Sequence, residues 1–232
     1  MLINFPLFPL GFTLRTGIQG GTFDPIHFGH LCSAEDVSFK LKLDRVIFVP
    51  SGAPPHKSSP LMASASDRFK MVEIAIEDHP AFFSDSIELD REGFSYTIDT
   101  LKVLSETSCK GDQIFFIIGE DAFLNLHTWK EPLEVLDKVN FAVTLREGYS
   151  ARDIISEVKG NFNESKLKFE VNFLSENKCR VIQSNCFVEF VHIRKLDISS
   201  SNIRENIKNS RSIRYLLPRS IERFIIEKEL YV

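Results

Sequence analysis

The sequence predicts a doubly wound α/β fold, in which a parallel sheet has helices on both faces and a small C-terminal helical portion follows. Short β-type runs alternate with amphipathic stretches of about a dozen residues, which is the pattern of βαβ units. Two runs, 46–49 and 114–118, are apolar without alternation, as expected of strands buried on both sides. Ligands of such folds bind at the carboxyl ends of the strands, so the loops 20–27, 50–58 and 119–129 should open onto one crevice.

The first half of the chain is expected to contain two strands and three helices. The strands lie at 12–19 and 45–50, and helical spacing predicts helices over 28–42, 66–77 and 95–106. The apolar positions that define the first two helices are Leu31, Ala34, Val37, Phe39, Leu41, Phe69, Val72, Ile74 and Ile76. A Ser/Pro-rich loop separates the second strand from the second helix.

The second half continues the alternation. A continuous apolar run at 113–119, stopped by glycine, is the clearest strand of the chain, and 140–146 repeats its form. Strand-like runs also occur at 166–174 and 186–193, and a hairpin is one arrangement that they allow. We interpret the region around them, 150–195, as a family-variable elaboration without chemistry of its own.

The C-terminal region predicts two helices, 201–209 and 218–230, the second of which begins with proline. The chain length fits one domain. We therefore expect an N-terminal extension over 1–12 and a single domain over 13–232, whose last part, 196–232, carries the C-terminal helices.

Composition argues against several classes of protein. The hydrophobic fraction of 43% and the charged fraction of 26% are ordinary for a soluble globular protein. A formal net charge of -4 leaves no general basic surface for sequence-independent nucleic-acid binding. The four cysteines lie far apart, so neither a zinc site nor a disulfide framework is indicated. No basic signal-peptide region and no run of ~18 apolar residues is present, so we expect a cytoplasmic protein.

Residues 20–31, GGTFDPIHFGHL, carry the main chemical signal. Gly20 and Gly21 follow a strand, where glycines can adopt positive φ and let backbone N–H groups approach an anion. His27 and His30 lie three residues apart in the first turn of a helix, so they share a face at its positive end. This arrangement predicts a phosphate site. The alternative is a tight turn before a helix, with histidines that cap or pack.

Other known phosphate motifs do not fit. The glycine spacing is neither G-x-G-x-x-G nor G-x-x-x-x-G-K-[ST], which argues against a nicotinamide-dependent oxidoreductase and a P-loop nucleotidase.

Two basic residues are further candidates for binding phosphate. Lys57 follows Pro54 and Pro55, whose stiff backbone would hold its ammonium at the end of the second strand. Arg204 follows serines at a helix N-terminus, where it could bind phosphate bidentately. A surface lysine and a simple N-cap with a solvated arginine are the plain alternatives.

The polar residues near the third crevice loop are also candidates. Trp129, the only tryptophan, stands beside charged residues rather than inside an apolar run. Asp121 lies two residues past Gly119, where it could accept hydrogen bonds from ribose hydroxyls or cap the next helix. We interpret Asp24 as a residue that shapes the first loop, and His56 as a second group of the lysine loop that could approach phosphates.

Several of these segments together resemble a known family. GGTFDPIHFGHL resembles the [HT]-x-G-H signature of the nucleotidyltransferase α/β-phosphodiesterase superfamily and, within it, the bacterial nicotinate-nucleotide adenylyltransferases. Further matches, in the same order, are VPSGAPPHK (49–57), GFSYTIDTL (93–101), FIIGEDAFLNLHTWKEPLEVL (116–136), ISSSNIRENI (198–207) and the tail SIRYLLPRSIERFIIEKELY. The resemblance covers about residues 13–149 and 196–231. Ser201 stands where threonine is usual, and it keeps the hydroxyl.

The resemblance implies a Rossmann-like fold and transfer of AMP from ATP to nicotinate mononucleotide, with deamido-NAD and pyrophosphate as products. The catalytic residues that it implies are His27, His30, Lys57 and Arg204. The implied ATP contacts are Gly20, Gly21, Thr22, Phe23, His27, His30, Lys57, Gly119, Asp121, Ser200, Ser201, Ile203 and Arg204. The implied mononucleotide contacts are Tyr96, Thr97, Asp121 and Trp129, with the indole stacked on the nicotinate ring. Mg²⁺ is expected to arrive on ATP, held mainly by phosphates and water.

Alternatives stay open at this point. A sister adenylyltransferase could act on nicotinamide mononucleotide or on phosphopantetheine, because an amide in place of a carboxylate changes a single contact. A non-catalytic nucleotide-binding module could keep the same fold, although the intact histidines, lysine and arginine argue against it. The expected partners are ATP and the mononucleotide, without nucleic acid or membrane, and the sequence allows a homo-oligomer.

Overall fold

An eight-stranded sheet forms the centre of the protein in a computed structural model that describes residues 13–52, 63–145, 148–194 and 196–232. Its strands, in spatial order, are β3 (Phe82–Ser84), β2 (Arg45–Pro50), β1 (Arg15–Gly21), β4 (Gln113–Gly119), β5 (Asn140–Leu145), β8 (Phe187–His192), β7 (Lys178–Val181) and β6 (Val171–Ser175). The first six strands are mutually parallel, and β7 runs antiparallel to both of its neighbours. The predicted parallel sheet is therefore confirmed.

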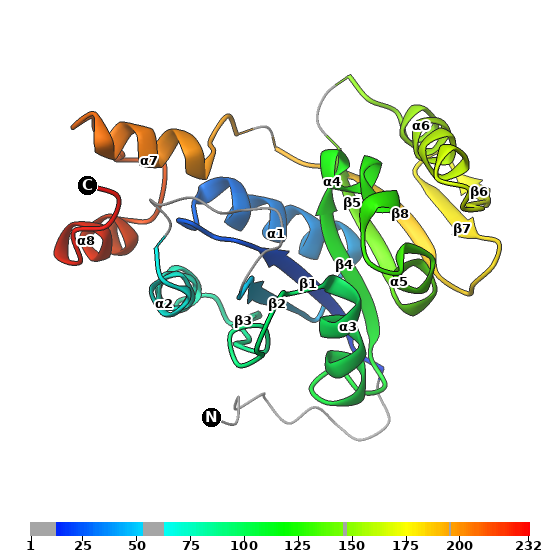
Figure 1. The fold of residues 1–232 in the computed structure, drawn as a ribbon, viewed down its shortest axis with the longest axis horizontal. Coiled ribbons are helices and arrows are strands. Elements are labelled where there is room, and N and C mark those ends of the chain that lie inside the picture. Colours follow the sequence, from blue (N-terminus) through cyan, green and yellow to red (C-terminus); the bar gives the residue numbers. More distant parts are fainter. Residues whose placement is uncertain (1–12, 53–62, 146–147, 195) are drawn as a thin grey trace.

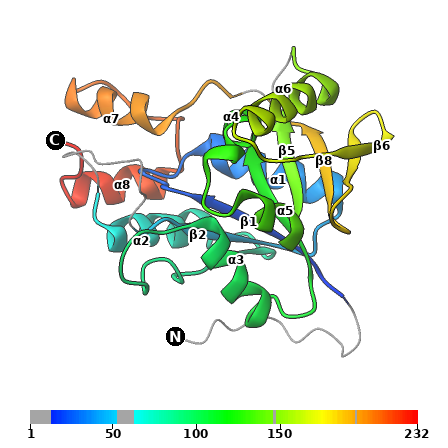
Figure 2. The ribbon, with the colours of Figure 1, turned by 45° about the vertical axis from the view of Figure 1, so that its right-hand side comes forward.

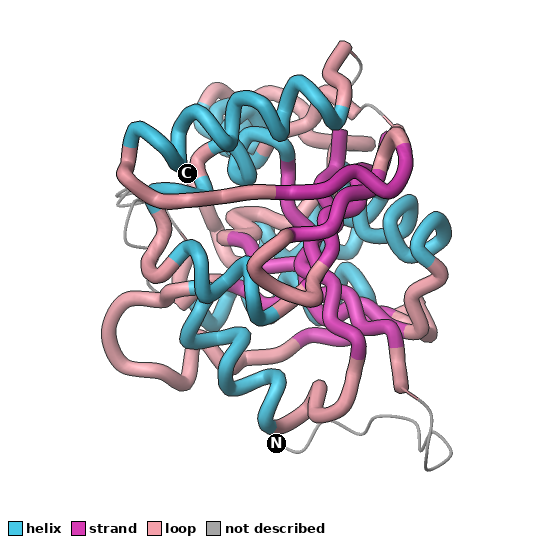
Figure 3. Tube along the Cα trace, turned by 90° about the vertical axis from the view of Figure 1, so that its right-hand side faces the viewer, coloured by secondary structure: helices cyan, strands magenta, loops and turns pink. Residues whose placement is uncertain are grey.

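Helices cover both faces of this sheet, as Figure 3 shows from the side. One face carries α1 (Phe28–Leu41), α2 (Ala65–Ile76), α7 (Ser200–Lys208) and α8 (Arg219–Glu227). The other face carries α3 (Thr97–Glu106), α4 (Glu120–Leu124), the 3-10 turn η1 (Leu126–Thr128), α5 (Pro132–Lys138) and α6 (Ala151–Glu164). The C-terminal helices α7 and α8 lie together at the end of the molecule opposite α6 and β6 (Figures 1 and 2).

Continuous apolar strands supply both hydrophobic cores at once. Along β4, Ile114, Phe116 and Ile118 point into the core under α3, α5 and α6, whereas Phe115 and Ile117 point into the core under α1 and α2. Side chains alternate between the two faces of a strand, so a strand that is buried on both faces needs apolar residues at successive positions. This is the physical reason why the unalternating runs predicted a doubly covered sheet.

The order of the strands brings the predicted ligand loops to one edge of the sheet. β1 pairs with β2 on one side and with β4 on the other, and the chain changes direction of winding between them. The ends of β1 and β4, at Gly21 and Gly119, therefore lie at the same edge of the sheet. The backbone N–H of Ser51 donates to the carbonyl of Gly21 at 2.8 Å, which brings the start of the second loop to that edge as well.

Two expectations about individual elements were wrong. Phe39 is 82% exposed, because the buried stripe of α1 follows Ala34, Val37 and Leu41, and position 39 lies about 200° round the helix from Val37. The runs at 171–175 and 187–192 do not pair with each other, since β7 lies between them.

The region 150–195 also contains a helix that the sequence reading missed. In α6 the Ser150 side chain and Asp153 form a capping box, and Ile154, Ile155 and Val158 are buried against the sheet. β8 then pairs with β5, so this region extends the central sheet. Within the described part of the chain, no helix is long and apolar enough to cross a membrane.

Candidate active site

The two glycines that end β1 do not have the positive φ that the sequence suggested. Neither Gly20 nor Gly21 has a positive φ, and both belong to the strand. The left-handed residue of the turn is Phe23, at φ 49°, and its ring folds back over Gly21. A Cβ on Gly21 would lie 3.1 Å from that ring. Gly21 therefore makes room for a buried aromatic ring.

His27 and His30 form a reciprocal cap at the start of α1. The Nδ1 atom of His27 accepts a hydrogen bond from the N–H of Gly29 at 3.1 Å, and Nδ1 of His30 accepts one from the N–H of His27 at 3.3 Å. The two rings stack with centroids 3.8 Å apart. Because Nδ1 is an acceptor in both rings, a neutral imidazole at either position carries its proton on Nε2. Both histidines are thereby held as Nε2–H donors.

The backbone N–H groups at this helix end all have hydrogen-bond acceptors within the protein. The N–H groups of His27 and Gly29 donate to the imidazoles, and that of Phe28 donates to the carbonyl of Leu216 at 3.1 Å. These three N–H groups are therefore already engaged within the protein. What this end of α1 can offer an anion is its dipole and the imidazole N–H groups.

Gly29, inside H-x-G-H, has a steric role in this arrangement. A Cβ at this position would lie 2.9 Å from both Cε1 and Nδ1 of the His27 ring. The glycine lets the imidazole lie flat against the backbone it caps, so the spacing of the motif follows from the cap.

Burial makes His27 a neutral donor, since desolvation lowers its pKa to about 4. In the unfolded chain a histidine titrates near pH ~6.5. The unfolded state therefore binds the proton first, and the protein should lose stability as pH falls from about 6.5 to about 4. We expect this histidine to account for a loss on the order of 1–3 kcal/mol across that window.

The free energy of unfolding, measured with urea between pH 7.5 and pH 4 for the wild-type protein and for His27→Asn, checks this expectation. Asparagine preserves an N-cap acceptor but does not titrate. The profile of the variant should be flatter than that of the wild-type protein, and parallel profiles would contradict the assignment.

Asp24 holds the β1–α1 turn to the C-terminal region. Its buried carboxylate accepts hydrogen bonds from the N–H of Ala63 at 3.0 Å and from the hydroxyl of Tyr231 at 2.7 Å. Burial, with the charge of Asp24, raises the pKa of Tyr231 and keeps that hydroxyl a donor. Arg204 donates from Nη1 to the backbone carbonyl of Asp24 at 2.6 Å. These contacts agree with a role of Asp24 in shaping the loop.

The start of α7 lies against the same turn. Ser199 caps the helix, and the Ser200 hydroxyl donates to the carbonyl of Pro25 at 2.9 Å. Arg204 Nη2 lies 3.4 Å from the Ser201 hydroxyl. Among the described residues, no acceptor is found for the backbone N–H groups of Ser200 and Ser201. This helix end, unlike that of α1, presents backbone donors next to a guanidinium.

Two of the predicted ATP contacts can act only through their backbone. The side chains of Phe23 and Ile203 are buried in the core between the sheet and α1, α2, α7 and α8. Thr22 contributes its carbonyl to the packing of the turn, where it accepts from Arg68 Nη1 at 2.7 Å.

The sequence reading missed Arg68, which joins the loops of the site. This fully buried side chain donates to the carbonyls of Thr22, Gly52 and Ala63 at 2.7, 3.1 and 3.3 Å. The signal was present, because Arg68 lies three and four residues before Met71 and Val72, on the buried stripe of α2.

Gln19 was missed as well. It is a buried polar residue in an apolar strand, and Nε2 lies 3.4 Å from the carbonyl of His30. Its Oε1 atom is buried and has no hydrogen-bond partner among the described residues.

The second half of the site lies at the end of β4. A Cβ on Gly119 would lie 2.5 Å from Asp121 Oδ1, so the absence of a side chain lets this carboxylate fold back toward the strand end. Asp121 is exposed, and no side chain caps α4, so the alternative capping role is not observed. Trp129 is half-buried and packs edge-on against Phe116, with ring centroids 6.1 Å apart.

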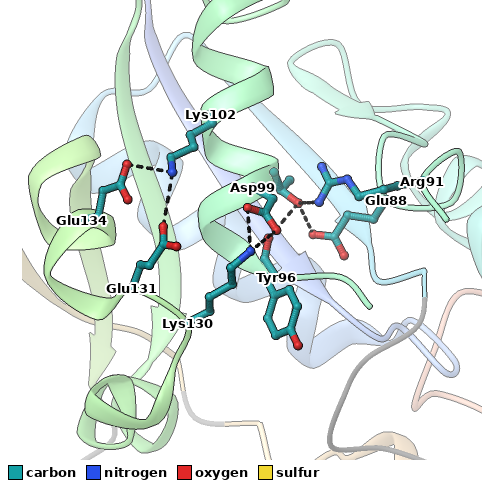
Figure 4. Close-up of polar contacts among 9 residues, drawn as sticks. Glu88, Arg91, Tyr96, Asp99, Lys102, Lys130, Glu131 and Glu134 are labelled. Atoms are coloured by element: carbon teal, nitrogen blue, oxygen red, sulfur yellow. Dashed lines mark hydrogen bonds and ion pairs between the residues drawn. The ribbon is translucent and has the colours of Figure 1, made fainter. Parts of the chain in front are cut away.

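The T-W-K and S-Y-T segments meet at this end of the sheet. Tyr96 and Thr97 begin α3 without a side-chain cap, and both are half-buried. Lys130 places its ammonium 4.8 Å from the centroid of the Tyr96 ring and 3.0 Å from Asp99 Oδ2 (Figure 4). The four predicted mononucleotide contacts thus come from neighbouring segments, α3 and the β4–α5 connection.

The predicted Lys57 and its neighbour His56 lie outside the described residues, as does most of the proline loop. Among the described residues, no group of three or more His, Cys, Asp or Glu side chains could hold a metal ion.

Comparisons with known proteins show which family the chain resembles over most of its length. A family model described as cytidylyltransferase-like matches residues 18–206. The chain is 42% identical over 218 residues to a probable nicotinate-nucleotide adenylyltransferase of Thermoanaerobacter sp., covering 94% of both chains. It is 39% identical to one of Dictyoglomus thermophilum, covering 94% of this chain and all of the relative. A solved nicotinic acid mononucleotide adenylyltransferase of Plasmodium falciparum, complexed with NaAD, shares the fold, with a TM-score of 0.70, 19% identity, and coverage of 94% of this chain and 97% of that one.

Proposed function

The chain belongs to the cytidylyltransferase-like family and, within it, to the nicotinate-nucleotide adenylyltransferases, and we propose that it transfers AMP from ATP to nicotinate mononucleotide. The products are deamido-NAD and pyrophosphate, a step of NAD biosynthesis. The observation that carries the assignment of the site is the imidazole cap of α1, which holds His27 and His30 as Nε2–H donors at the end of the same β1–α1 turn whose Asp24 carbonyl accepts from Arg204.

The reaction needs little activation of the nucleophile. A phosphate monoester has a second pKa near ~6, so at neutral pH the mononucleotide phosphate is mostly dianionic. One of its oxygens forms a bond to the α-phosphorus of ATP while the bond from that phosphorus to the bridging oxygen breaks and pyrophosphate leaves. The residues of the site have to align two anions and neutralise the charge that develops on the transferring and leaving groups.

We assign this neutralisation to four side chains. His27 and His30 donate from Nε2 to phosphate oxygens, and Arg204, already anchored on Asp24, donates from its guanidinium. The backbone N–H groups of Ser200 and Ser201 bind phosphate beside it. Lys57 would supply a further ammonium. Mg²⁺ enters with ATP as part of the substrate, held by phosphate oxygens and water.

The pyridine end of the mononucleotide is assigned to the second half of the site. Trp129 stacks on the nicotinate ring, Tyr96 and Thr97 contribute polar contacts, and Asp121 accepts from ribose hydroxyls. Support for this assignment comes from the start of α3, which no side chain caps, and from the half-buried indole of Trp129, whose plane is nearly perpendicular to the Phe116 ring.

A pyrophosphate-release assay tests the proposed function directly. The purified chain is supplied with ATP, Mg²⁺ and one acceptor, which is nicotinate mononucleotide, nicotinamide mononucleotide or phosphopantetheine. Turnover that prefers nicotinate mononucleotide supports the proposal. Preference for the amide or for phosphopantetheine would assign the chain to a sister activity, and nucleotide binding without turnover would indicate a non-catalytic module.

Replacing Trp129 with alanine should raise the KM for the mononucleotide about tenfold and leave the KM for ATP unchanged. The physical reason is the loss of one aromatic stacking contact, worth on the order of 1 kcal/mol. Steady-state kinetics with each substrate varied in turn checks this expectation. Phe39→Ala, which removes an exposed ring far along α1, is the matched control, and an unchanged mononucleotide KM in Trp129→Ala would remove the stacking role.

A further inference from the structure

Lys130 joins two segments of the proposed pyridine subsite. Its ammonium contacts both carboxylate oxygens of Asp99, at 3.0 and 3.2 Å, and stands 4.8 Å from the centroid of the Tyr96 ring (Figure 4). Asp99 lies in the first turn of α3, and Lys130 directly follows Trp129. One cation therefore joins the segment that begins α3 to the segment that carries the indole.

The ion pair between Lys130 and Asp99 contributes little to the stability of the fold. The side chains of Lys130 and Asp99 are 40% and 33% exposed, and pairs of this kind contribute little to folding. The same helix has a second such pair farther along, where Lys102 lies 2.8 Å from Glu134 and 3.3 Å from Glu131. What distinguishes Lys130 is that its charge is held against an aromatic ring assigned to the substrate.

The charge bears on the choice of substrate. Nicotinate and nicotinamide mononucleotides differ in one group on the pyridine ring, a carboxylate in one and a neutral amide in the other. A fixed ammonium near that ring attracts the carboxylate and leaves the amide almost unaffected. The start of α3, which no side chain caps, adds a positive field of the same sign.

We propose that Lys130 is a specificity-determining residue, which favours nicotinate over nicotinamide mononucleotide through its ammonium, and that Asp99 and the Tyr96 ring position this ammonium. The inference rests on the proposed function and deepens it. Asp99 has two opposing effects, because it holds the lysine in place and also screens its charge.

The measurement is the ratio of kcat/KM for nicotinate mononucleotide to kcat/KM for nicotinamide mononucleotide. Lys130→Met should lower this ratio about tenfold, since it removes the charge and keeps an unbranched side chain. Lys130→Arg should retain most of it. Asp99→Asn removes the screening charge in a nearly isosteric way and should leave the ratio at or above the wild-type value. Lys102→Met removes the lysine of the second ion pair, which lies on α3 with Asp99, and should leave the ratio unchanged.

A purely structural role gives a different pattern. If Lys130 only braced the two segments, Lys130→Met and Asp99→Asn would raise both KM values together and leave the ratio unchanged, which would overturn the proposal. A fall of the ratio in Lys102→Met as large as in Lys130→Met would also overturn it. The melting temperature of each variant is measured to show that it is folded. If Lys130→Met does not fold, Lys130→Gln takes its place. Absence of turnover by the wild-type protein with both mononucleotides would refute the proposed function, and an unchanged ratio in an active protein would refute this inference alone.

Discussion

Replacing His30 with alanine is expected to lower kcat by about 10²–10³-fold while changing the KM for ATP far less. The expected loss is that of one preorganised hydrogen-bond donor aimed at developing charge. The cap places this donor before substrate arrives, because Nδ1 of His30 is engaged by the N–H of His27 and the neutral ring must carry its proton on Nε2.

The alanine variant also removes half of the helix cap, so a second variant separates the two roles. Glutamine at the third helical position can still accept from the N-cap backbone, as in an ordinary capping box. His30→Gln should therefore keep a melting temperature near that of the wild-type protein and show the same loss of kcat. His79→Ala, which removes a histidine paired with Glu35 at the surface, controls for general effects.

Steady-state pyrophosphate release, together with thermal melting, checks these expectations. Near wild-type kcat in both His30 variants would show that the imidazole acts only as a cap. A loss of kcat confined to the alanine variant would lead to the same conclusion.

Replacing Arg68 with methionine should destabilise the protein by roughly 3 kcal/mol or more and abolish most of the activity. Three carbonyl oxygens, of Thr22, Gly52 and Ala63, would lose a charged donor in a buried site, and each unsatisfied group costs about 1–3 kcal/mol. These carbonyls belong to the turn after β1, the loop after β2 and the start of α2. Activity should fall even where the variant is folded, because the loops would lose their common anchor.

A second buried arginine supplies the matched control. Arg45 lies at the amino end of β2, where it contacts Asp112 at 2.7 Å and Thr16 at 2.9 Å. Arg45→Met should lose comparable stability, since it leaves a buried carboxylate without its cation. Its kcat, measured well below its melting temperature, should stay near the wild-type value. Urea unfolding and kinetics of both variants make the comparison, and equal kcat in the two would contradict a positioning role for Arg68.

Much of the site could be predicted because its residues carry local signals. The H-x-G-H spacing, the serines before Arg204 and the single tryptophan beside lysine are readable without a structure, and the structure places them at the neighbouring ends of β1 and β4. Their assignment to substrates stays a proposal. The short β3 strand was missed because three residues leave no periodic pattern to detect.

The role of the glycines shows where prediction from the sequence fails. A double glycine after a strand suggested backbone freedom, but Gly21 and Gly29 are needed because the rings of Phe23 and His27 lie against them. Each ring comes from a residue two positions away in the sequence, but the backbone conformation of the turn decides whether that ring folds back over the glycine.

The sequence by itself determined the doubly wound sheet, the family and the identity of most candidate residues, since periodicity, turn chemistry and motif spacing act over a few neighbouring positions. The tertiary structure alone decided how these residues are held. Arg68 reaches Thr22 across 46 residues of sequence, and Tyr231 reaches Asp24 across 207. A hydrogen bond between distant segments depends on how the sheet and its helices pack, so a local sequence pattern does not predict it. Only the structure, likewise, showed that the two imidazoles accept hydrogen bonds from the backbone N–H groups of His27 and Gly29 at the start of α1.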